Sequence, residues 1–72
     1  MADRQFARAS KRLAASVKRR RIELGMTQED AAHAMDMAVR HYQKLEGGVL
    51  NVTLRTLIRV ASALHLDLKD LF

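Results

Sequence analysis

The sequence contains no cysteine, which excludes disulfide bonds, thiolate zinc sites and thiol nucleophiles together. Because small secreted domains usually depend on disulfides, this absence favours a reducing compartment. No apolar run approaches the roughly 20 residues of a membrane span, and the N-terminal residues lack the apolar centre of a signal peptide. We therefore expect a cytoplasmic protein that does not interact with a membrane.

Patterns typical of catalysis and metal binding are also missing. There are no clustered carboxylates, no nucleophile with an adjacent base and no glycine loop for phosphates, so we do not expect an enzyme. His33 and His41 fall on different predicted helices without a third ligand, and His65 lies far along the chain. The sequence predicts neither a metal site nor a small-molecule cofactor.

The basic residues are concentrated in the first third of the chain. Residues 1–24 carry eight Lys or Arg and two Asp or Glu, a balance of +6, whereas the remaining residues carry five basic and six acidic groups, a balance of −1. A polyanion is the natural partner of such a surface, because phosphate neutralisation releases counterions. The alternative is a solvated face that aids solubility.

The 72 residues suffice for one domain, whose small core buries only roughly 60% of its unfolded surface, so a partner subunit would add stability. Residues 13–72 form the predicted domain. Residues 1–12 are helix-forming and basic, and either extend the first helix or form an arm on DNA. Helical spacing over 13–24 places Leu13, Val17 and Leu24 on one stripe, with Phe6 in line.

The segment 27–48 reads as two short helices joined by a tight turn. Thr27 is a predicted N-cap with Asp30 as its capping-box partner, and Gly25 suits the residue that ends the preceding helix. Asp36 lies where the chain must turn and tolerates left-handed geometry. The second helix, from Ala38 to the glycine pair at 47–48, is expected to bury two side chains, Tyr42 and Leu45.

The other face of this second helix carries groups that read base edges in a major groove. Val39 offers methyl groups, Arg40 and Lys44 suit guanine, and Gln43 suits adenine. These four residues are the predicted base-reading set.

The remaining segments complete a small helical domain. Thr53 is a predicted N-cap for a helix whose core positions are Leu54, Leu57, Ile58, Ala61 and Leu64. Asp67 and Asp70 open a single-turn helix. The final apolar side chains cover either the core or a dimer partner, and they are Leu66, Leu68, Leu71 and Phe72.

The order and spacing of three motifs resemble the Cro/repressor-type (XRE-like) helix-turn-helix family from about Leu13 to Phe72. The motifs are VKRRRIELGMTQEDAA, AVRHYQKLEGG and TLRTLIRVASALHLDLKDLF. Three positions depart from the family pattern: Ala38 replaces a Ser or Thr cap, Val52 a frequent Pro, and His65 a Gly. The resemblance implies an all-α, compact five-helix repressor-like DNA-binding domain with its helix-turn-helix at helices 2 and 3.

The resemblance also implies roles for particular residues. It pairs Arg21 with Glu46. The helix dipole supports this pairing, because a negative charge in the last turn of a helix is unfavourable unless a nearby cation neutralises it. The resemblance gives Gln28 a phosphate contact and a bracing role. The predicted phosphate contacts are Thr27, Gln28, His41 and Asn51, with the backbone amides of the glycine pair as further donors. The resemblance also favours a two-fold dimer through the C-terminal residues Leu66, Leu68, Leu71 and Phe72.

The expected function is a sequence-specific regulator of transcription that binds a palindromic operator on double-stranded DNA as a homodimer. Repression by blocking polymerase is the simplest mechanism for so small a protein. One alternative is a protein-interaction module, such as the antitoxin of a toxin–antitoxin pair or a controller protein that contacts polymerase. Another is an RNA-binding or architectural protein, which would show little preference among duplex sequences.

Overall fold

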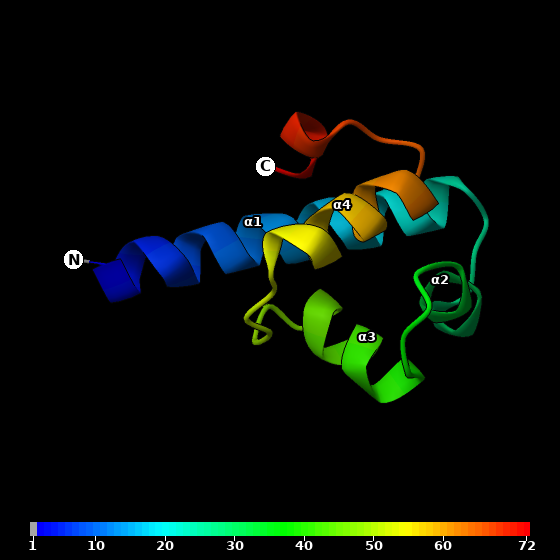
Figure 1. Cartoon of the computed structure of the whole chain (residues 1–72), viewed down its shortest axis with the longest axis horizontal. Helices are drawn as coiled ribbons and strands as arrows, with labels where there is room; N and C mark the ends of the chain where they lie inside the picture. The colour runs from blue at the N-terminus through cyan, green and yellow to red at the C-terminus, as the bar shows by residue number, and fades with distance from the viewer. Residues whose placement is uncertain (1) are drawn as a thin grey trace.

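A computed structural model of the protein describes residues 2–72 and shows four α-helices followed by one turn of 3-10 helix. Their bounds are α1 Ala2–Glu23, α2 Gln28–Ala34, α3 Val39–Glu46, α4 Leu54–Ala63 and η1 Leu68–Leu71. The long α1 lies along the molecule, α4 crosses in front of it, and α3 and η1 lie on opposite sides of these two helices (Figure 1). The expected all-helical repressor-like fold is confirmed, with a 3-10 turn where the sequence predicted a fifth helix.

Helix α1 continues without a break from Ala2, so residues 2–12 are helical, and the N-terminal end of the helix projects beyond the other helices (Figure 1). Leu13 and Val17 are buried as predicted, at 4% and 0% exposure. The prediction was wrong for Leu24, which follows the last helical residue and remains 36% exposed, and Phe6 is 50% exposed. The apolar stripe of α1 therefore enters the core only in its second half.

The caps and turns of the helix-turn-helix follow the sequence closely. Thr27 accepts a hydrogen bond from the backbone N–H of Asp30, whose carboxylate accepts one from the N–H of Thr27, both at 3.0 Å. Gly25 and Asp36 are left-handed, with φ of 71° and 54°. Ala38 is the N-cap residue of α3 but supplies no capping oxygen. These features end α1 and set the angle at which α3 leaves α2.

Helix α4 differs from its predicted packing. Thr53 caps it as expected, accepting from the N–H of Thr56 at 3.1 Å. However, Leu54 and Ile58 are 63% and 54% exposed, while Val60 is fully buried. The prediction of Leu54 and Ile58 as core residues was wrong, because only the side of α4 that packs on the core and on η1 is covered.

The core is formed by residues from every helix. Its largest fully buried side chains are Val17, Met35, Tyr42, Leu45, Val60, Leu64 and Leu71. Burial of Tyr42 and Leu45 fixes one side of α3 against α1 and leaves its opposite side outward. Within residues 2–72, no helix is both long and apolar enough to cross a membrane.

Candidate nucleic-acid interface

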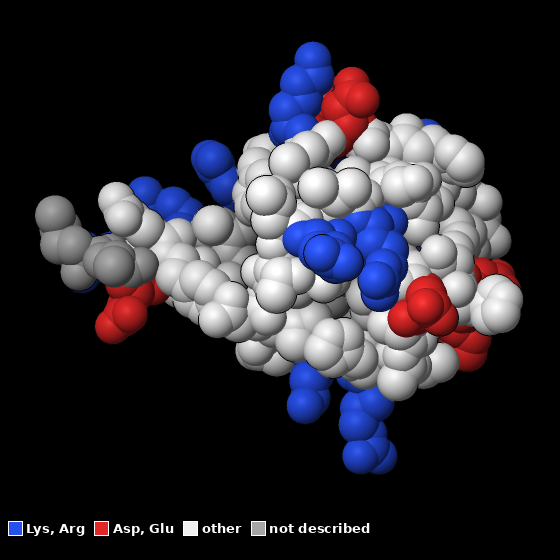
Figure 2. Space-filling view, in the orientation of Figure 1, with Lys and Arg blue, Asp and Glu red and all other residues white. Residues whose placement is uncertain are grey.

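The outward side of α3 presents the four predicted base-reading residues together. Arg40, Gln43 and Lys44 are exposed, and Val39 is 36% exposed. His41 is also exposed, beside the buried Tyr42. Lys and Arg side chains project from the edge of the molecule where α3 lies (Figure 2). One short helix thus carries two cations, an amide and a pair of methyl groups on a surface free of covering elements.

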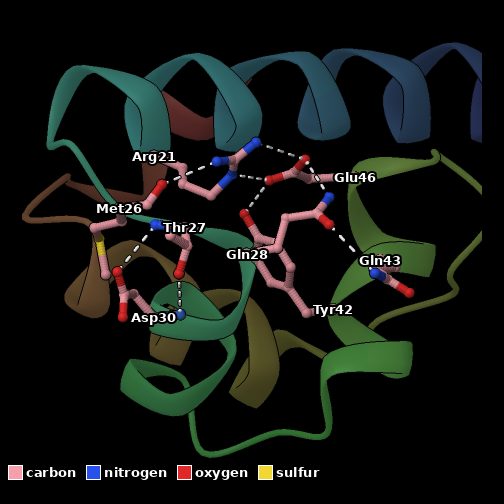
Figure 3. Close-up of polar contacts among 8 residues, drawn as sticks. All are labelled: Arg21, Met26, Thr27, Gln28, Asp30, Tyr42, Gln43 and Glu46. Carbon is pink, nitrogen blue, oxygen red and sulfur yellow. Dashed lines mark hydrogen bonds and ion pairs between the residues drawn. The ribbon is translucent and has the colours of Figure 1, made fainter.

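The carboxylate of Glu46 lies at the centre of a polar cluster behind this surface (Figure 3). Arg21 donates from Nε to Glu46 Oε2 at 2.5 Å and from Nη2 to Oε1 at 3.3 Å. The Tyr42 hydroxyl donates to Oε2, and Gln28 Nε2 donates to Oε1 at 3.1 Å. Arg21 also donates from Nη1 to the Met26 carbonyl at 2.9 Å. Side chains from α1, α2 and α3 therefore converge on one carboxylate.

The electrostatics of this cluster favour the ionised carboxylate. Burial by itself would raise the pKa of Glu46, but hydrogen bonds from Arg21, Tyr42 and Gln28 lower it below the ordinary value. The hydrogen bond to Glu46 raises the pKa of Arg21, and burial together with Glu46 raises the pKa of Tyr42. At neutral pH the cluster is thus an ion pair with a neutral phenol beside it.

A hydrogen bond connects the cluster to the outward side of α3. Gln43 Nε2 donates to Gln28 Oε1 at 3.3 Å, while Gln28 Nε2 is held by Glu46 (Figure 3). Since a carboxylate can only accept, the Gln28 amide has one orientation, and Gln43 must present its NH₂ group to it. Gln43 keeps its carbonyl oxygen and second amide hydrogen for another partner.

The predicted phosphate contacts are distributed around α3. Thr27 and Gln28 lie at the start of α2, His41 on α3, and Asn51 on the loop that follows. Thr27, His41 and Asn51 are exposed, and Gln28 is partly buried against Glu46. Hydrogen bonds from the backbone N–H and side chain of Thr27 lower the pKa of Asp30, which keeps an anion at the α2 cap.

The glycine pair after α3 does not provide the free amides that the sequence suggested. The N–H of Gly47 donates to the Gln43 carbonyl at 2.9 Å, and that of Gly48 donates to the Leu45 carbonyl at 3.2 Å. Both donors are used to end the helix. Gly48 has a φ of 74°, and a Cβ built there would lie 3.7 Å from the Cβ of Ala14.

Several contacts in the structure were not predicted from the sequence. The Tyr42–Glu46 bond follows the i, i+4 spacing of a helix and could have been found from that spacing. The Gln28–Gln43 bond joins two helices and has no such signal. Likewise, Arg20 donates from Nε to the Leu64 carbonyl at 2.9 Å, across 44 residues of sequence, and so caps the C-terminal end of α4.

The four predicted dimer residues do not lie in one environment. Leu68 and Phe72 are 38% and 53% exposed, and Leu66 is partly buried against the core. Leu71 has no exposed surface and belongs to the core. Leu71 therefore has no surface for a partner in this conformation, contrary to its predicted dimer role.

Comparison with protein families agrees with this geometry. The helix-turn-helix family (HTH_3) matches residues 17–71, and the chain therefore belongs to that family. The match begins within α1 and ends at the last residue of η1. A search of curated proteins found no significant match.

Two solved structures have the same fold. The HTH_3 family transcriptional regulator from Vibrio cholerae superposes with a TM-score of 0.85 at 21% identity, covering 93% of this chain and 38% of that one. A tyrosine-to-phenylalanine mutant of the restriction-modification controller protein C.Esp1396I gives a TM-score of 0.77 at 25% identity, covering 82% of this chain and 75% of that one. This chain thus spans well under half of the Vibrio cholerae protein and has the fold of a transcriptional regulator.

Proposed function

We propose that this protein is a sequence-specific DNA-binding regulator of transcription that inserts α3 into the major groove. The observation that carries the proposal is the division of α3 into two sides. Tyr42 and Leu45 are fully or almost fully buried, whereas Arg40, Gln43 and Lys44 are exposed. Arginine and lysine suit guanine, and glutamine suits adenine, so the exposed side can distinguish base pairs.

Phosphate contacts would hold the helix in register. Thr27 and Gln28, at the start of α2, and His41 and Asn51, near either end of α3, can donate hydrogen bonds to backbone oxygens. The contacts of Arg21 on α1 and Gln28 on α2 with Glu46 keep α3 rigid relative to those two helices. Rigidity matters because a side chain can form two hydrogen bonds to one base only if the backbone that carries it is held in place.

We further propose that the protein binds as a homodimer to a palindromic operator and represses by blocking polymerase. Two-fold symmetry would place two copies of α3 in successive major grooves roughly 34 Å apart. The similarity to a restriction-modification controller protein favours a second candidate, a controller protein. A promoter–reporter assay with the selected site separates the two, since a repressor lowers transcription and an activating controller raises it.

Selection from random duplex DNA at physiological salt tests the proposal. We expect an enriched site with two inverted halves, whose affinity exceeds that of random duplex by at least about 10³-fold. Equal binding to all duplexes, with capture of one protein from the source cell instead, would indicate a protein-interaction module such as an antitoxin.

A further inference from the structure

The outer side of α1 carries charge of one sign. No Asp or Glu occurs between Arg4 and Ile22. Of the basic residues of α1, Arg20 and Arg21 bond to groups within the domain. The others are exposed, and none of them forms an ion pair within residues 2–72. We call them the basic stripe, and they are Arg4, Arg8, Lys11, Arg12, Lys18 and Arg19.

Helical geometry places the basic stripe on one side of α1. Each residue of an α-helix turns by about 100° around the axis, so the stripe residues fall within an arc of about 120°. The middle of this arc is opposite Leu13 and Val17, which are buried in the core. From Arg4 to Arg19 the stripe is about 22 Å long. Basic side chains project from the end of the molecule where the N-terminal half of α1 lies (Figure 2). The stripe is therefore a continuous positive surface that points away from the core.

The charges of the basic stripe repel one another. Arg4, Arg8 and Arg12 follow at i, i+4 spacing, at which like charges destabilise a helix. A surface helix that is merely solvated usually alternates signs along one face, and each pair of opposite charges then adds stability. No acidic residue is interspersed here, so an external anion is needed to relieve the repulsion. The stripe is thus better suited to a polyanion than to water alone.

The residue types and the packing of α1 favour phosphate over other anionic surfaces. Arginines predominate in the stripe, and the arginine fork can bind two phosphate oxygens at once. An anionic membrane surface fits less well, because a helix that binds such a surface inserts its apolar side. The apolar side of α1 holds Leu13 and Val17 and is already buried in the core.

We propose that the basic stripe is a second DNA-binding surface, which contacts the sugar-phosphate backbone of duplex DNA without reading its sequence. Only the choice of duplex DNA as the polyanion rests on the proposed function. The family match begins at residue 17, whereas Arg4, Arg8, Lys11 and Arg12 precede it. The stripe is therefore largely a feature of this chain beyond the matched region.

The stripe faces a different direction from α3. Helix α3 meets α1 at Arg21, which binds Glu46, and at Ala14, whose Cβ lies 3.7 Å from a Cβ built at Gly48. These two positions of α1 are about 100–120° around the axis from the middle of the stripe. The backbone that the stripe contacts therefore belongs either to DNA that flanks the α3 site or to a second duplex.

Neutralisation of one arginine pair tests the proposal. The stripe variant is Arg8→Gln with Arg12→Gln, and its matched control is Arg55→Gln with Arg59→Gln, an exposed pair at the same spacing on α4. Binding to a random-sequence duplex of about 30 base pairs is measured by fluorescence anisotropy over a salt series. We expect the stripe variant to bind at least about tenfold more weakly at low salt, with a salt slope smaller by about 2 per bound chain. The control should bind within about twofold of the parent, with the parent's slope. Circular dichroism and melting verify that both variants fold.

A capture assay identifies the source of the backbone. An immobilised duplex carries the complete selected site, so that α3 is already engaged, and a labelled duplex is added in solution. Capture by the parent and its loss in the stripe variant would identify a second duplex. Absence of capture, with the loss of affinity confined to duplexes that extend beyond the site, would identify flanking DNA.

Equal changes in the two variants would reflect net charge alone and would overturn the inference. So would a stripe variant with the parent's affinity and salt slope, including one that has lost binding to an acidic protein instead. The random-sequence duplex separates these failures from failure of the proposed function. A selected site that the stripe variant binds with the parent's slope contradicts only the stripe. Absence of any selected site, with a reduced slope in the stripe variant, contradicts only sequence-specific recognition.

Discussion

Arg21 on α1 and Glu46 at the end of α3 form a bidentate ion pair, with Nε and Oε2 2.5 Å apart and side-chain exposures of 14% and 5%. The pair joins residues 25 positions apart and fixes the end of α3 relative to α1. Because Glu46 also accepts from Gln28, and Gln28 accepts from Gln43, the pair is linked to an outward-facing side chain through two hydrogen bonds.

The substitution Glu46→Gln should lower the free energy of unfolding by about 3 kcal/mol, since it leaves the Arg21 guanidinium without its anion in a mostly buried position. Urea denaturation at neutral pH measures the change. Glu23→Gln is the matched control, because Glu23 forms a 3.5 Å pair with Arg20 while being 53% exposed. Its effect should stay within about 0.5 kcal/mol. Equal stability of the Glu46 variant and the parent would show that the pair is not structural.

The same carboxylate predicts an acid-sensitive stability. The pKa of Glu46 is lower in the folded protein than its ordinary value of 4.5, so the folded state binds protons less readily than the unfolded chain. The stabilisation from Glu46 is therefore fully present above pH 4.5 and is lost as the pH falls below it toward the folded pKa. Urea denaturation over a pH series should show this loss. The Glu46→Gln variant should have a shallower dependence, and the lowered pKa of Asp30 should leave a residual slope.

Substitutions on α3 and α2 should separate base reading from phosphate contact. We expect Arg40→Ala to cost roughly 1–3 kcal/mol of binding and to relax preference at one base pair of the selected site. Gln28→Ala should weaken binding to all sequences more evenly through its phosphate contact. Competition binding against single-base variants of the site measures both. Uniform weakening by Arg40→Ala would instead identify Arg40 as a phosphate contact.

The N-terminus of α3 offers a stabilising substitution. Ala38 has the extended backbone of an N-cap residue, with φ −66° and ψ 145°, but supplies no oxygen to the first helical amides. Ala38→Ser should raise the free energy of unfolding by about 1 kcal/mol. Thr53→Ala, which removes an existing cap from α4, should have a similar effect of opposite sign. Thermal melting of both variants compares them, and a destabilised serine variant would contradict the prediction.

His65 offers a second stabilising substitution. It follows α4 with a φ of 57°, which is unfavourable for a residue with a Cβ, and its side chain is exposed. His65→Gly should stabilise the protein by about 1 kcal/mol, because the lost strain exceeds the added freedom of the unfolded chain. His33→Gly, within the regular helix α2, should instead destabilise it by a similar amount. Chemical denaturation of the two glycine variants gives the comparison.

The sequence by itself determined the local structure of this protein. Thr27, Thr53, Gly25 and Asp36 act on backbone atoms within a few residues, so their caps and turns could be predicted from short stretches of sequence. The division of α3 into a buried and an exposed side also followed from helical spacing, which placed Tyr42 opposite the base-reading residues.

Only the tertiary structure decided which apolar residues enter the core and which polar groups meet. Leu54 and Ile58 fit the same helical stripe as Ala61, yet they remain exposed, because burial depends on where the core and η1 cover α4. Leu71 entered the core instead of a dimer surface for the same reason. The Gln28–Gln43 bond and the contact of Arg20 with Leu64 likewise join distant segments, whose approach is set by packing of the whole chain and by no local pattern.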